Sequence, residues 1–87
     1  MNVLAEIRNR FAAALAPLCE DPAELLELIR RSQDPKFGDY QANCAMPLGK
    51  QLSRSPRDVA AEIVAALKID DLCQPPEVAG PGFINLS

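Results

Sequence analysis

The chain has 87 residues, 48% of them hydrophobic, and a net charge of −3, which suits one small folded domain and argues against disorder. No apolar run approaches the ~20 residues that span a bilayer, the N-terminus lacks a signal-peptide pattern, and the acidic balance argues against non-specific nucleic-acid binding. With no histidine and no paired cysteines, we expect no metal site, and we interpret the three cysteines as reduced thiols of a cytoplasmic protein: Cys19, Cys44 and Cys73.

The N-terminal third predicts a helix, a shorter helix and a strand. Asn2 is a suitable N-cap for the first helix, and Pro17 is placed to end or kink it. Residues 21–24 form a second helix start, and residues 29–33 then favour a strand as much as a continued helix, so we expect a short helix followed by a strand. The first helix is predicted by an apolar stripe at three- and four-residue steps: Leu4, Ile7, Phe11, Leu15 and Leu18.

The middle of the chain predicts a loop and a pair of helices. Residues 34–41 are rich in turn formers and carry two aromatic side chains beside Lys36. A helical pattern resumes near Asn43, although Pro47 suits it only in the first turn. Ser55 then caps a further helix with proline at its first position, which we expect to continue to Asp70.

The last eleven residues predict a β-hairpin. Residues 77–79 form one strand, and in Gly80-Pro81-Gly82 we expect the proline at the first central turn position and the following glycine at the second.

The final strand alternates in character. Ile84 and Leu86 share one face as the natural core pair, which leaves Phe83 and Asn85 together on the other face. A ring can stack on a nucleobase and a carboxamide can read a base edge, but the same pattern suits a ring packed under a helix or loop beside an ordinary polar residue. The pattern alone favours the second interpretation, because most aromatic side chains are packing residues.

Taken together, these elements predict an α+β domain of two layers, with helices on one face of a small, mostly antiparallel sheet. The other face is then left partly open to a ligand.

Charge is unevenly distributed along the chain. Residues 30–57 hold six basic and two acidic side chains, whereas the segments before and after are acidic. This pattern suits either an ordinary solvated surface or a basic middle that meets phosphates. In the second case, Lys50, Arg54 and Arg57 are the candidate contacts.

Nothing in the sequence predicts catalysis. A nucleophile with its base, a metal or a tuned acid–base pair is required, and no motif supplies one. We therefore expect the isolated chain to have no catalytic residues and no cofactor.

Two blocks, taken in order, resemble a known family. The first is Phe37-Gly38-Asp39-Tyr40-Gln41-Ala42-Asn43, followed by a helix and Ser55-Pro56-Arg57, and the second is Val78-Ala79-Gly80-Pro81-Gly82-Phe83-Ile84-Asn85. In this order they are similar to the N-terminal additional domain of bacterial arginyl-tRNA synthetase, a class I aminoacyl-tRNA synthetase. The resemblance covers nearly the whole chain.

The resemblance implies that residues 1–87 form a single α-β-β-α-β-β domain of a longer enzyme, without its catalytic and anticodon-binding domains. Such domains contact the D-loop at the outer corner of arginine tRNA. An aromatic residue and an Asn or Gln two positions later hold a D-loop nucleotide, commonly an adenosine, and Phe83 and Asn85 match that pair. The parent enzyme would join arginine to its tRNA with ATP.

The implied partners are arginine tRNA and the remaining domains of the same synthetase, with no membrane contact, and we expect a monomer. The competing hypothesis is a non-catalytic protein-interaction module that uses the open sheet face or the exposed edge of the hairpin.

Overall fold

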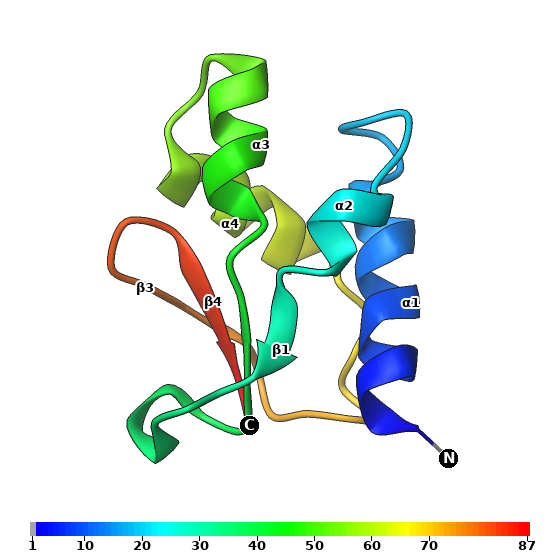
Figure 1. The fold of residues 1–87 in the computed structure, drawn as a ribbon, viewed down its shortest axis with the longest axis vertical. Coiled ribbons are helices and arrows are strands. Elements are labelled where there is room, and N and C mark those ends of the chain that lie inside the picture. Colours follow the sequence, from blue (N-terminus) through cyan, green and yellow to red (C-terminus); the bar gives the residue numbers. More distant parts are fainter. Residues whose placement is uncertain (1) are drawn as a thin grey trace.

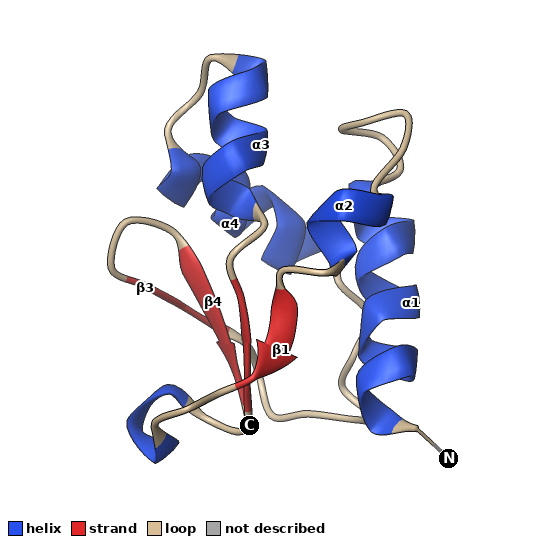
Figure 2. Cartoon of the chain, in the orientation of Figure 1, coloured by secondary structure: helices blue, strands red, loops and turns tan. Residues whose placement is uncertain are grey.

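The computed structural model describes residues 2–87. Within them, four α-helices pack against a four-stranded antiparallel sheet, which confirms the predicted α+β class (Figures 1 and 2). The helices are α1 (Val3–Leu15), α2 (Ala23–Leu26), α3 (Ala45–Leu52) and α4 (Pro56–Ala66). The strands are β1 (Ile29–Arg31), β2 (Tyr40–Ala42), β3 (Glu77–Ala79) and β4 (Phe83–Leu86), and a 3-10 turn, η1 (Pro35–Phe37), joins β1 to β2.

The sheet has the strand order β1-β2-β4-β3, and all three pairings are antiparallel. Strand β4 is therefore central and pairs with β2, although more than 40 residues separate Gln41 from its partner Asn85. Ile84 lies opposite Ala42 on one side and Val78 on the other. Strand β4 therefore joins the N-terminal strand pair, β1 and β2, to the C-terminal strand β3.

The two N-terminal helices follow the local sequence. Asn2 caps α1 by accepting a hydrogen bond from the Ala5 amide at 3.1 Å, and the helix ends before Pro17, because proline has no amide hydrogen to donate. Asp21 accepts a bond from the Ala23 amide at 3.0 Å where α2 begins. The chain then turns into β1, so the predicted helix followed by a strand is confirmed.

Residues 34–41, which their turn formers predict to be a loop, include the start of a strand. Tyr40 and Gln41 belong to β2. A three-residue strand has little intrinsic signal, and this one is held by pairing on both sides, with β1 and with β4. Such pairing joins residues far apart in sequence, so local patterns do not reveal it.

The helix boundaries in the middle of the chain also differ from the predicted ones. Helix α3 begins at Ala45 rather than Asn43, which places Pro47 in its first turn, where a missing amide hydrogen is tolerated. Helix α4 begins at Pro56 as predicted, but Ser55 makes no side-chain capping bond. The helix ends at Ala66 instead of continuing to residue 70, because the backbone at Leu67 turns extended, with φ −73° and ψ 126°.

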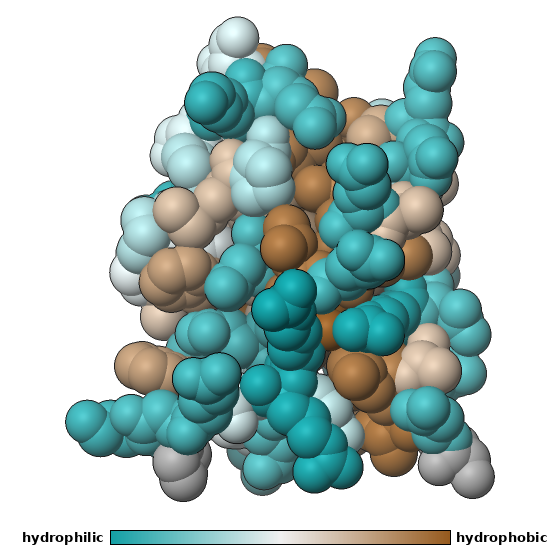
Figure 3. Space-filling view, in the orientation of Figure 1, coloured by the Kyte–Doolittle hydropathy of each residue, from teal (hydrophilic) through white to brown (hydrophobic). Residues whose placement is uncertain are grey.

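The core fills the space between the helices and one face of the sheet. Helix α1 packs against β1, and α4 packs against β3 and β4. In Figure 3 hydrophilic side chains cover much of the viewed face, and hydrophobic residues show between them. The largest fully buried side chains come from both layers and include Phe11, Ile7, Leu15, Ile63, Ile84 and Leu86.

The β3–β4 hairpin turns differently from the prediction. The Gly82 amide donates to the Ala79 carbonyl at 3.2 Å, so Gly80 and Pro81 are the two central residues, shifted by one position. Gly80 has φ +54° and Gly82 has φ +141°, values that glycine adopts readily. Ala79 pairs with Phe83, so the loop between the two strands has three residues.

Candidate nucleic-acid interface

The alternation predicted for β4 is confirmed. Ile84 and Leu86 are fully buried against the helices, whereas Phe83 and Asn85 are half-buried on the opposite, open face. The Phe83 ring lies next to Gly80, since a Cβ added there would be 3.4 Å from the ring. A solvent-facing ring and carboxamide therefore lie two positions apart on the central strand.

The strand register places a row of polar residues across the open face. Arg30 of β1 lies opposite Gln41, which lies opposite Asn85, which lies opposite Glu77 of β3. In the centre of this row the Gln41 Nε2 donates a hydrogen bond to the Asn85 Oδ1 at 3.0 Å. This contact fixes the Asn85 carboxamide and leaves its NH2 group to donate to a ligand.

Of the three predicted basic contacts, Arg57 lies against the β3–β4 turn, because its guanidinium donates to the Gly80 carbonyl. Lys50 lies on α3, Arg54 in the α3–α4 connection and Arg57 on α4 (Figure 1). The start of α4 touches the hairpin, because a Cβ added at Gly82 would lie 2.9 Å from the Cβ of Pro56. All three side chains are exposed.

These three residues differ in the contacts that their side chains make. The Arg54 guanidinium is paired with Glu62 at 2.6 Å, and Arg57 donates to the Gly80 carbonyl and so ties α4 to the hairpin turn. Lys50 makes no ion pair within residues 2–87. Of the three, Lys50 is therefore best placed to meet a phosphate without giving up another contact.

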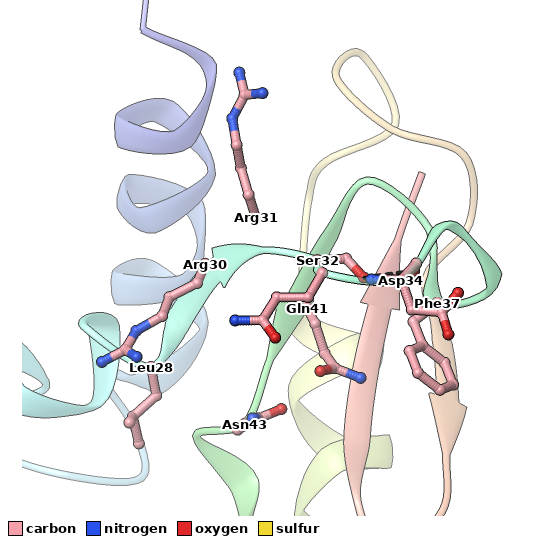
Figure 4. A pocket seen from close by; sticks show the side chains of 9 residues that line it. Leu28, Arg30, Arg31, Ser32, Asp34, Phe37, Gln41 and Asn43 are labelled. Carbon is pink, nitrogen blue, oxygen red and sulfur yellow. Dashed lines mark hydrogen bonds between the residues drawn. The ribbon is translucent and has the colours of Figure 1, made fainter.

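Beside the polar row, the open face contains a hollow of about 410 Å³. Figure 4 shows Gln41 and Asn43 between Arg30 on one side and Phe37 on the other, while Arg31 points away. The sequence predicts no site residue among the aromatic side chains of residues 34–41. The β2–β4 register brings this segment to β4, and local patterns do not contain that register.

Cys44 is the cysteine that the core encloses. No group of three or more histidine, cysteine or acidic side chains in residues 2–87 is arranged to hold a metal ion. Cys44 is fully buried, and burial raises the pKa of its thiol to about 11. The thiol is therefore protonated at neutral pH and is a poor nucleophile.

None of the helices in residues 2–87 is both long and apolar enough to cross a bilayer.

Fold and open face together define a small two-layer α+β module that presents aromatic and carboxamide groups on a solvent-facing sheet. The sequence profile of the family described as "Arginyl tRNA synthetase N terminal domain" matches residues 5–87. The chain belongs to this family, as its two ordered blocks predicted.

Individual relatives agree with the family match. An arginine–tRNA ligase of Rhodopirellula baltica is 55% identical over 86 residues, which cover 99% of this chain and 13% of the relative. Those of Synechococcus elongatus and Alteromonas mediterranea are 49% and 48% identical, over 97% and 99% of this chain and 15% of each relative. The chain thus spans less than a sixth of the length of these relatives.

Proposed function

We propose that this chain is the tRNA-binding N-terminal domain of an arginine–tRNA ligase and that the open face of its sheet contacts the D-loop of arginine tRNA. The observation that carries the proposal is the pairing of Phe83 and Asn85 on the solvent-facing side of β4, with Asn85 already oriented by Gln41. Both residues match the family's D-loop pair, and the match to relatives named arginine–tRNA ligases supports the assignment.

In this proposal the two side chains have separate tasks. The Phe83 ring stacks on one unpaired base, a contact worth roughly 1–3 kcal/mol and tolerant of base identity. Asn85 reads the edge of the same base, and a bidentate contact to adenine would add a preference of about 1–3 kcal/mol. The ring therefore supplies affinity and the carboxamide supplies selectivity.

The reaction itself is assigned to the rest of the enzyme. The complete ligase would use ATP to join arginine to the tRNA in the cytoplasm, while this domain holds the outer corner of the tRNA. We expect the 87-residue chain alone to show no ATP–pyrophosphate exchange above a heat-treated control.

The competing protein-interaction function would use a sheet edge or the open face. Strands β1 and β3 are the edges, but each has only three residues, and they carry the exposed charges of Arg30, Arg31 and Glu77. Short, charged edges oppose the addition of another strand. The sheet edges therefore support a protein-interaction function less well than the open face supports the binding of a base.

The deciding experiment compares tRNAs with the isolated 87-residue chain. Binding of arginine tRNA is measured over a salt series against a second tRNA of equal length and against an arginine tRNA whose D-loop adenosine is replaced. We expect binding that weakens as salt rises and a preference for arginine tRNA that the replacement removes. Equal binding of all three tRNAs would reject the D-loop assignment.

A further inference from the structure

Phe37 is an exposed aromatic side chain that the proposed D-loop contact does not use. It ends the η1 turn and is 42% exposed, although burying a ring of this size is normally favourable. It borders the hollow of about 410 Å³ next to Gln41 and Asn43, and it shares a second, smaller hollow with Asn85. Phe37 therefore lies beside the candidate nucleotide site while belonging to a different segment.

The hollow has the size and the polar groups of a ligand site. Its volume falls in the range of small-molecule sites. The Oδ1 atom of Asn43 is closed to solvent and has no hydrogen-bond donor within residues 2–87. This arrangement is costly, and a rotation of the side chain toward a donor in the hollow would relieve the cost. The amino and imino groups of a nucleobase are such donors.

The charges around the hollow favour one orientation of a bound nucleotide. Arg30 makes no ion pair within residues 2–87, and its Nε donates to the Glu27 carbonyl, which leaves its terminal NH2 groups for another acceptor. The acidic Glu77 lies at the opposite end of the polar row. A phosphate is therefore favoured on the β1 side and disfavoured on the β3 side.

We propose that this hollow binds the base of a second unpaired nucleotide of the same tRNA loop, adjacent to the one held by Phe83 and Asn85. Phe37 stacks on this base, the Asn43 side chain rotates so that its Oδ1 accepts a hydrogen bond from the edge of the base, and Arg30 contacts its phosphate. The proposal rests on the proposed function and extends it from one nucleotide to two.

The test is a binding cycle with the full-length ligase. A single abasic nucleotide is placed in turn at each unpaired D-loop position of arginine tRNA, and affinity is measured for the unaltered enzyme, Phe37→Ala and Phe83→Ala. One abasic position should weaken binding to the unaltered enzyme roughly 5- to 100-fold and have no further effect on Phe37→Ala. A different, neighbouring position should behave in this way with Phe83→Ala.

The outcomes separate the two proposals. A variant couples to a D-loop position when the abasic nucleotide there weakens the unaltered enzyme but has no further effect on the variant. If Phe37→Ala couples to no position while Phe83→Ala does, the second site is rejected and the D-loop function stands. If both variants couple to the same position, one base is held between two rings, and the second site is again rejected. If neither couples to any position, the D-loop function fails as well.

Two further variants control for folding and chemistry. Phe37→Trp keeps an aromatic surface and should retain the coupling that Phe37→Ala loses. Val3→Ala removes a similarly exposed apolar side chain from α1 and should leave every affinity unchanged. Because Phe37 is exposed, Phe37→Ala should melt within a few degrees of the unaltered protein.

Discussion

Gln41 and Asn85 lie directly opposite each other on neighbouring strands, and the Gln41 amide donates a 3.0 Å hydrogen bond to the Asn85 carbonyl oxygen. The bond spans 44 residues of sequence and lies on the open face of the sheet, beside Phe83. It holds one carboxamide with another before any ligand arrives, so less side-chain freedom is lost when Asn85 meets a base.

This relationship predicts that Gln41 controls selectivity through Asn85. Gln41→Leu keeps the volume but removes the donor, so the Asn85 carboxamide is free to rotate. We expect the preference for adenine at the contacted D-loop position to fall toward that of Asn85→Ala, while binding of a tRNA with another base there changes little. The measurement is the ratio of the affinities for these two tRNAs. If Gln41→Leu leaves that ratio unchanged, Asn85 selects adenine without the hydrogen bond from Gln41.

The two faces of β4 predict opposite phenotypes for neighbouring residues. Phe83→Ala should weaken arginine-tRNA binding by roughly 1–3 kcal/mol with little loss of stability, because the ring faces solvent. Ile84→Ala should lower the free energy of unfolding by about 2–5 kcal/mol, because it leaves a cavity in the core. Thermal melting and tRNA binding of both variants check this, and a Phe83→Ala protein that melts far below Ile84→Ala contradicts the assignment.

The basic residues should differ in what they contribute to tRNA binding. Lys50→Ala should weaken all tRNAs alike and reduce the salt slope by up to about one unit. Arg54→Ala should do less, because Arg54 is already paired with Glu62. Arg57→Ala should also loosen the hairpin turn that it holds at Gly80. Salt series on the three variants distinguish these cases, and three unchanged slopes would mean that the patch is only a solvated surface.

The buried Cys44 thiol predicts a loss of stability at high pH. Its pKa is about 11 in the folded chain against 9.0 for a free thiol, so the folded state holds the proton more tightly than the unfolded state. The resulting stability is complete below pH 9 and is lost as the pH rises to 11, by up to about 2–3 kcal/mol. Urea unfolding between pH 8 and 11 should show this decline, and Cys44→Ala should flatten it relative to the unaltered chain. Parallel curves for the two proteins would contradict the assignment to Cys44.

Local sequence determined most of the helices and the face pattern of the last strand. Asn2 and the proline at position 17 bracket α1, and the alternation from Phe83 to Leu86 decides which side chains enter the core. These features depend on neighbours a few residues apart, where backbone restriction and side-chain periodicity act directly.

Tertiary structure alone decided which residues meet on the open face. Strand β2 is three residues long and exists because β1 and β4 pair with it, so its segment was interpreted as a loop. The same pairing brings Gln41 to Asn85 and sets the hollow beside Phe37 next to them. Contacts between strands far apart in sequence depend on the global register, which short-range patterns do not specify.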